Sequence, residues 1–231
     1  MKRIFAANRT LRKRLIAGAY SVLAVAALFV AQSAFGVSGD QSTVDYAGVF
    51  SSSTVPPSDS SAPIVNGDRT FTVEVWVKPS SKYSASDYML LYGQNIPTSG
   101  CVANRYGLFL NTTAARPDLF AVHIAMDNCG VFTDAYVPAN QWSHIAHVVN
   151  DGTSIVYVNG QQIYNAGYGW GSIAGNVTLG SALNGADRLI GSLDQVKVWD
   201  SALSQSQVQS SMHTFSTGGM SGLRALYDFN E

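Results

Sequence analysis

The chain has 231 residues, of which 13% are charged, and its formal net charge at pH 7 is −1. That near-neutral total hides a division: the first 36 residues contain six Lys or Arg and no acidic residue, whereas residues 37–231 contain eight basic and fifteen acidic residues, a formal charge of −7. The acidity excludes the clustered cationic surface that nucleic-acid binding requires, so we expect no nucleic-acid partner.

Residues 1–36 have the pattern of a signal peptide. A basic region precedes the apolar run of residues 15–31, and small residues follow, with cleavage expected between Ser33 and Gly36. An uncleaved membrane anchor is the alternative, although the run of 17 residues is shorter than the about 20 that a spanning helix needs. Both interpretations place residues 37–231 outside the cytoplasm, extracellular or at the cell surface, and membrane contact would come only through an uncleaved segment.

Residues 37–231 predict one all-β domain. A short first strand at residues 44–50 is followed by a loop, because Pro56, Pro57 and Pro63 cannot donate ladder hydrogen bonds. After Arg69, ten short runs rich in Val, Ile, Tyr and Phe alternate with Gly, Asn, Asp and Pro at about ten-residue spacing, from TFTVEVWVKP to LRALYDFN. This rhythm predicts an antiparallel sandwich or barrel.

The two cysteines, Cys101 and Cys129, fit a hairpin in which RYGLFLN pairs with LFAVHIA about a turn near Ala115. Opposed residues would then have numbers that sum to 230, as Tyr106 and Ile124 do, and the cysteines have the same sum. Two thiols in an exported protein are expected to pair. We therefore predict a disulfide that closes the open end of this ribbon.

Two turn signals and one helix signal follow in chain order. Residues 150–153 (Asn-Asp-Gly-Thr) and Asn159-Gly160 separate three strands, and these residue types tolerate the positive φ of tight hairpins. Before the last strand, Ser204 precedes Gln207 by three residues, which is the capping-box arrangement at the start of a helix. We expect one short surface helix there.

His144 and His147 are candidate metal or catalytic residues by type. They lie in the predicted strand WSHIAHVV, where residues three apart point to opposite faces and cannot converge on one ion. We expect each to be a half-buried strand histidine with a hydrogen-bond partner, and we assign no metal ligands.

Carboxylates give no catalytic pattern either. Glycoside hydrolysis needs two carboxyl groups held about 5 to 10 Å apart. Glu74 is alone in its strand, and the strand of Asp194 offers only Leu-Asp-Gln-Val-Lys. No motif of a serine hydrolase, zinc protease or phosphate-binding loop is present. We assign no catalytic residue and expect no enzyme.

The segment Gly-Tyr-Gly-Trp-Gly at residues 167–171 offers Tyr168 and Trp170 on a flexible backbone. Aromatic side chains in glycine-rich loops stack on sugar rings or contact protein partners. The alternative is that Trp170 turns inward and caps the core.

Acidic and amide groups could supply oxygen ligands to calcium. They occur at residues 127–129, at Asp134 and at residues 184–187, which include Asn184 and Asp187. No EF-hand spacing is present, and turn formation is the commoner use of Asn and Asp. No cofactor is required by the sequence, and calcium stays an alternative.

Three segments resemble one family. FTVEVWVKP is similar to a Phe-Thr-x-x-x-Trp-Val-Lys-Pro strand, and WSHIAHVVNDGTSIVYVNG to a Trp-x-His strand with an Asp-Gly turn and a closing Tyr-Val-Asn-Gly. IGSLDQVKVWDSALSQSQV resembles a strand followed by an Ala-Leu-Ser helix start. These motifs are typical of laminin G-like, concanavalin A-like jelly-roll domains, and the resemblance extends from Val44 to Glu231. It implies two stacked antiparallel sheets, with the first and last strands adjacent.

The resemblance implies binding more than catalysis, because its members bind carbohydrates or proteins and some use calcium. We expect a non-catalytic extracellular recognition module whose partner is a glycan. The expected ligand contacts are Tyr168, Trp170, Asn184 and Asp187, in loops at one rim or on the concave sheet. The alternative is a structural or adhesive cell-surface protein that contacts other extracellular proteins.

Overall fold

The computed structural model describes residues 48–50, 58–59, 63–64, 69–80, 88–97, 103–113, 116–126, 130–167, 173–182, 185–214 and 220–229. All of them belong to one unit, Asp45–Glu231. Within these residues, no helix is long and apolar enough to cross a membrane. The predicted signal peptide and both cysteines lie outside the described residues, so the signal peptide and the disulfide stay predictions.

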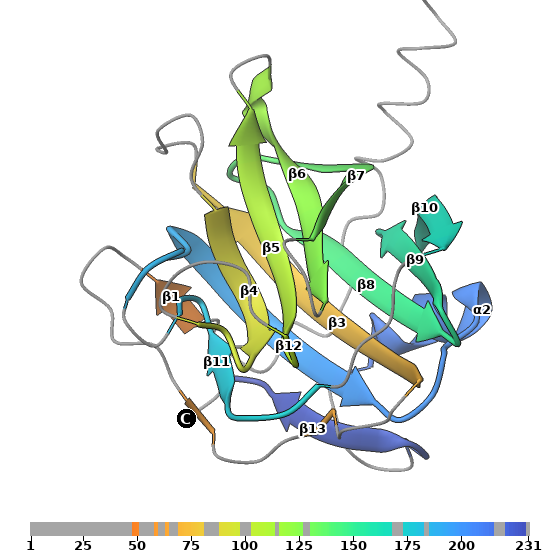
Figure 1. Ribbon diagram of the computed structural model, residues 1–231. Coiled ribbons are helices and arrows are strands. Elements are labelled where there is room, and N and C mark those ends of the chain that lie inside the picture. The colour runs from red at the N-terminus through yellow and green to blue at the C-terminus, as the bar shows by residue number, and fades with distance from the viewer. Residues whose placement is uncertain are drawn as a thin grey trace, which may run out of the picture. The chain divides into compact units, whose positions relative to one another are not determined.

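Two antiparallel sheets are stacked face to face (Figure 1). The seven-stranded sheet has the order β1 (Gly48–Phe50), β12 (Gly191–Trp199), β3 (Thr70–Pro79), β8 (Ser143–Asn150), β9 (Thr153–Val158), β10 (Gln161–Gly167), and β13 (Leu223–Tyr227) also pairs with β12. The six-stranded sheet has the order β2 (Ser58–Asp59), β11 (Val177–Leu179), β4 (Tyr88–Gln94), β5 (Tyr106–Thr113), β6 (Arg116–Met126), β7 (Val131–Pro138). The predicted all-β sandwich is confirmed.

Strand alternation builds the core between the sheets. In β3, Phe71, Val73 and Val75 are fully buried and belong to the main hydrophobic cluster, together with Leu108 and Leu110 of β5. The residues between them, such as Thr72 and Glu74, point to the opposite face of the sheet. They are also buried, because a second layer covers that face.

The second layer is the helix α2 (Gln205–Ser211). Ser204 is its N-cap, and the predicted capping box is present, since Ser204 and Gln207 each satisfy a backbone N–H of the other. Val208 of the helix packs with Trp199 and Leu203 in a separate hydrophobic cluster on the outer face of the seven-stranded sheet. The helix is therefore a cover for the sheet and not only a surface connection.

Both predicted tight turns are confirmed. Asn150 pairs with Thr153, and Val158 pairs with Gln161, so each hairpin has a two-residue loop. All four loop residues have positive φ, which is +43° and +88° at Asp151 and Gly152 and +49° and +73° at Asn159 and Gly160. These values fit the turn type that matches the twist of paired strands.

The predicted register of the β5–β6 hairpin is wrong by two residues. Tyr106 pairs with Met126 and not with Ile124, and Asn111 pairs with Ala121 and not with Leu119. The cause is an irregularity next to the turn, because Thr113 pairs with Arg116 whereas Thr112 pairs with Phe120. The extra residues on β6 shift the pairing but keep each side chain on its predicted face.

Candidate functional site

Of the four expected ligand contacts, Asp187 is the one that the structure describes. Tyr168, Trp170 and Asn184 lie outside the described residues and stay predictions. Asp187 has φ +50°, and its carbonyl oxygen accepts a hydrogen bond of 2.7 Å from the Leu90 N–H of β4. Asp187 therefore lies beside β4 of the six-stranded sheet.

Four aromatic rings gather on the outer face of the six-stranded sheet, one from each of the adjacent strands β4 to β7. We call Tyr88, Phe109, His123 and Phe132 the aromatic platform. Tyr88 and Phe132 stack with ring centroids 6.1 Å apart and an interplanar angle of 27°, and His123 lies 4.5 Å from Phe132 and 5.0 Å from Tyr88. Phe132 is 55% exposed, whereas Phe109 and His123 are each 4% exposed. The platform thus has one exposed ring on a buried base.

Register explains why these rings meet. Phe109 lies directly opposite His123, and His123 directly opposite Phe132. Residues that face each other on neighbouring antiparallel strands point to the same side of a sheet. Gly130, at φ +93°, lets the chain return closely along β6, since a Cβ there would lie 2.4 Å from the Ile124 carbonyl oxygen and 2.5 Å from His123 Nε2. A larger residue would push β7 and its Phe132 away.

Polar groups follow the exposed ring along its strand. Asp134 and Tyr136 follow Phe132 at two-residue spacing along β7 and so share its face. The Arg116 guanidinium lies over the Tyr136 ring, 4.8 Å from its centroid. On the opposite side, Leu90 belongs to a small hydrophobic cluster with Phe109 and Ala182, against which Tyr88 packs, and this cluster joins the platform to the loop of Asp187. A flat apolar ring can stack on a sugar, and the carboxylate of Asp134, the next side chain on that face, can bond a sugar hydroxyl.

The two histidines lie on opposite faces of β8, as predicted, but both are fully buried and not half-buried. His147 lies between the sheets, where its Nδ1 is 2.8 Å from the Tyr106 hydroxyl, and the two rings stack at 3°. Burial lowers the pKa of His147 to about 3 and raises the pKa of Tyr106 well above its ordinary value, so a neutral hydroxyl and a neutral imidazole share this hydrogen bond. This is a structural pair between the sheets.

His144 lies beneath the second layer, where α2 replaces the solvent that a half-buried residue would contact. Burial, together with the positive charges of Lys197 and His213, lowers the pKa of His144 to about 3. Its Nε2 is 3.8 Å from Glu74 Oε1, but a neutral imidazole forms no ion pair with that carboxylate. Its ring contacts Trp76, with centroids 5.3 Å apart.

Glu74 is the centre of a buried polar cluster under α2. Its carboxylate accepts a hydrogen bond of 2.9 Å from Trp199 Nε1 and one of 2.5 Å from the Ser211 hydroxyl of the helix. Burial raises the pKa of Glu74, and Ser211, Lys197 and Trp199 oppose that shift. Lys197 donates to the carbonyl oxygens of Ser211 and Thr214, each at 2.7 Å. Glu74 is 0% exposed, so its carboxylate serves to dock the helix and does not face a substrate.

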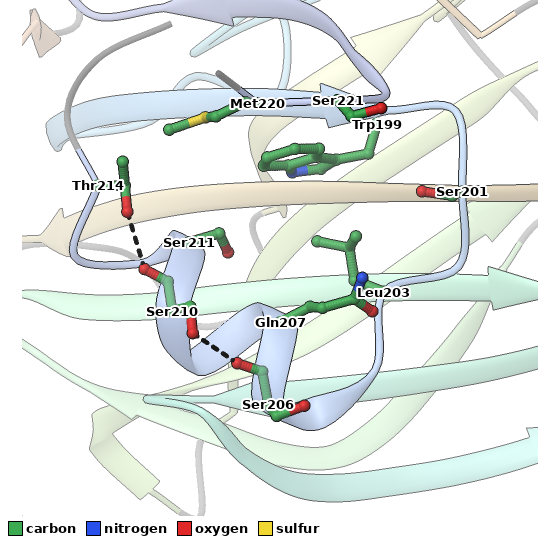
Figure 2. A pocket seen from close by; sticks show the side chains of 10 residues that line it. All are labelled: Trp199, Ser201, Leu203, Ser206, Gln207, Ser210, Ser211, Thr214, Met220 and Ser221. Carbon is green, nitrogen blue, oxygen red and sulfur yellow. Dashed lines mark hydrogen bonds between the residues drawn. The ribbon is translucent and has the colours of Figure 1, made fainter. Parts of the chain in front are cut away.

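A groove of about 340 Å³ opens above this cluster (Figure 2). Trp199 and Met220 lie on one side of it and the helix α2 on the other, as Figure 2 shows. The lining is Trp199, Ser201, Leu203, Ser206, Gln207, Ser210, Ser211, Thr214, Met220 and Ser221. None of these side chains is charged.

Within the described part of the chain, no three or more His, Cys, Asp or Glu side chains gather so that they could hold a metal ion. Of the expected calcium-ligand segments, residues 127–129 and Asn184 lie outside that part, and calcium binding stays an alternative prediction.

Sequence reasoning missed the aromatic platform and the groove. Tyr88 and Phe132 are 44 positions apart in the sequence, and nothing local marks them as neighbours. The signal that was available is the alternation of strands β5 to β7, which places Phe109, His123 and Phe132 on the faces opposite the core. This alternation tells which face of the sheet each side chain occupies, but not which strands are neighbours in the sheet.

Comparison with solved structures finds the same fold in proteins of low sequence identity. A candidate carbohydrate-binding protein from Bacteroides ovatus superposes with a TM-score of 0.61 at 18% identity, over 80% of this chain and 51% of its own. Domain 4 of a GH43 extracellular arabinanase from Geobacillus stearothermophilus, solved with arabinotriose, gives 0.53 at 16% identity, over 75% and 83%. A heptameric pentraxin from Limulus polyphemus gives 0.50 at 19% identity, over 71% and 78%. This chain thus spans about half the length of the Bacteroides ovatus protein.

No curated protein matches the sequence. A family model does match, over residues 49–209, which includes every strand from β2 to β12 and most of α2. That model describes concanavalin A-like lectins and glucanases, and the two stacked antiparallel sheets agree with it. The chain belongs to the concanavalin A-like lectin/glucanases superfamily.

Proposed function

We propose that this domain is a non-catalytic extracellular recognition module that binds glycans on the aromatic platform. The observation that carries the proposal is Phe132, a large apolar ring that is 55% exposed yet held in place by stacking on Tyr88 and by the edge of His123. A fixed ring loses little conformational entropy on binding, and a sugar can stack on it with its hydroxyls directed to polar neighbours.

Two structural neighbours support a glycan as the ligand class. The Geobacillus stearothermophilus domain was solved with arabinotriose, and the Bacteroides ovatus protein is a candidate carbohydrate-binding protein. The buried position of Glu74 supports a role without catalysis, because this carboxylate is enclosed by Trp199 and Ser211. Export through the predicted signal peptide would bring the domain to extracellular glycans.

The test is a glycan array with the purified protein and a Phe132→Ala variant. We expect the variant to lose at least tenfold in affinity for the glycans that the unchanged protein binds, which corresponds to about 1.4 kcal/mol. Ile163→Ala is the matched control, since Ile163 of β10 is also exposed, at 42%, but lies on the other sheet. Its binding should be unchanged.

Three outcomes would contradict the proposal. Binding that survives Phe132→Ala, with the variant still folded, would remove the platform from the site. Absence of binding to any glycan, together with binding to an extracellular protein, would favour the adhesive alternative. Release of reducing sugar from a bound glycan would contradict the non-catalytic assignment.

A further inference from the structure

The groove beside α2 lies on the seven-stranded sheet, whereas the aromatic platform lies on the six-stranded sheet. Its walls come from three separate segments: the end of β12 and the residues after it, the helix α2, and the turn before β13 (Figure 2). At about 340 Å³, its volume falls at the lower end of the range found for small-molecule pockets. A single sugar ring is a ligand of suitable size.

One wall is formed by Met220 and the exposed edge of a fixed tryptophan. The Trp199 indole is tied through Nε1 to Glu74 beneath it, at 2.9 Å, so its polar edge is engaged inside the protein. Trp199 is 5% exposed, so only an edge of its ring reaches the groove, and Met220 lies beside it, as Figure 2 shows. This wall can contact the apolar C–H face of a sugar but offers no partner for a charge.

The remaining lining is rich in hydroxyl groups. Seven of the ten lining residues are Ser, Thr or Gln, and three are Trp, Leu or Met. Several hydroxyls are already engaged within the helix, as Ser210 is with the Ser206 carbonyl oxygen and Thr214 with that of Ser210. The Ser201 and Ser221 hydroxyls make no hydrogen bond with any other described residue, so both their donors and their acceptors can serve a ligand.

The helix wall is held in position from below. Ser211 donates to Glu74, and Lys197 donates to the Ser211 and Thr214 carbonyl oxygens at the end of the helix. Leu203 N–H also donates to the Thr72 hydroxyl at 3.0 Å. These bonds join both ends of the helical segment to β3 and β12, so the groove is formed before any ligand binds, which lowers the entropic cost of binding.

From this geometry we propose a second ligand site in the groove, which binds one uncharged sugar residue between the wall of Met220 and the Trp199 edge and the hydroxyl-bearing side of α2. The site stands on its own observations and does not depend on the aromatic platform. Because the lining holds no cation, a carboxylate placed there would lose its hydration without a partner. The ligand class is therefore a neutral sugar and not an acidic one.

The test is a titration of the whole ¹⁵N-labelled protein, followed by the indole N–H signals of its four tryptophans. The probes are the methyl glycosides of glucose, galactose, mannose and arabinose, with that of glucuronic acid as the charged counterpart of glucose. We expect a saturable shift of the Trp199 signal with at least one neutral probe, and binding at least tenfold weaker for the glucuronic acid than for the glucose derivative.

Two variants assign that shift to the groove. Ser210→Phe places a ring in the opening from an exposed helix position and should weaken binding at least tenfold, whereas Asn165→Phe, exposed on β10, should leave binding unchanged. Replacing both Ser201 and Ser221 with Ala should weaken it roughly tenfold, through the loss of two hydrogen bonds.

Absence of any Trp199 shift with the neutral probes would overturn the inference, as would a shift that Ser210→Phe leaves unchanged. A stronger shift with the acidic probe would overturn the ligand class. The Phe132→Ala variant separates this result from the function proposed above: the Trp199 shift should persist in it, because the platform is on the other sheet.

Discussion

Lys197 shows how one residue can determine the position of a whole helix. It is 1% exposed, donates to two carbonyl oxygens of the α2 segment, and acts on Glu74 through its charge. Burial lowers the pKa of Lys197, and the negative charges of Glu74 and Asp194 oppose that shift. The charge of Lys197 offsets part of the cost of burying Glu74, and its removal would leave that carboxylate buried without a nearby cation.

We predict that Lys197→Met lowers the free energy of unfolding by about 3 to 5 kcal/mol, because Glu74 then stays buried without its cation. Urea denaturation gives this value. Lys78→Met is the matched control, since Lys78 is an exposed lysine on the neighbouring strand β3, and it should change stability by less than about 0.5 kcal/mol. Equal effects of the two substitutions would show that the buried cluster does not hold the helix.

At the scale of elements, the two tight turns share a pattern, Asp or Asn followed by Gly at positive φ, but they have different surroundings. Gly152 and Gly160 both have positive φ, of +88° and +73°. A Cβ on Gly152 would meet nothing within 4 Å, whereas one on Gly160 would lie 2.8 Å from the Gln209 side chain. Gln205 and Gln209 of α2 both donate to the Gly160 carbonyl oxygen, so the second turn is also a support for the helix.

We predict that Gly152→Ala costs about 1 kcal/mol, the penalty of a left-handed backbone for an L-residue. Gly160→Ala should cost about 2 kcal/mol or more, because Gln209 must also move and its hydrogen bond weakens. Chemical denaturation of the two variants measures the difference. If both lose the same amount, the contact between the turn and the helix has no energetic importance.

The sequence predicts these elements well because their determinants are local. The turn residues at 150–153 and 159–160 and the capping box at Ser204 each act within four positions, and all three are confirmed. The predicted register of β5 with β6 is wrong because an irregularity beside the turn adds residues to β6. No residue type in the sequence indicates this irregularity. The aromatic platform depends on that register and on strand order, so its members could be placed on a face but not assembled.

At the scale of the whole molecule, the two sheets are joined by a polar contact in an apolar interior. The Tyr106 hydroxyl of the six-stranded sheet and His147 of the seven-stranded sheet are 2.8 Å apart, and Phe71 lies edge-on to both rings. A proton on His147 would place a charge between the sheets. Since the folded pKa of about 3 is below the unfolded value of 6.5, folding favours the neutral form.

This contact predicts acid sensitivity. Below pH 6.5 the unfolded chain takes up a proton that the folded protein excludes until about pH 3, so stability is lost as pH falls through that window. By pH 5 the loss from His147 is about 2 kcal/mol. In urea titrations at pH 7.5 and pH 5, His147→Gln should lose about 2 kcal/mol less than the unchanged protein between the two values. The same loss in both would rule out His147 as a source.

The first and last strands both pair with the same edge of β12. Gly48, at the start of β1, lies opposite Leu193, and Tyr227, at the end of β13, lies opposite Val196, so the two positions are about 10 Å apart along that strand. The polypeptide therefore enters and leaves the sandwich at nearly one point. Such a domain can be inserted into a surface loop of another protein. It would need only short linkers at its two ends and would leave the backbone path of the host protein almost unchanged.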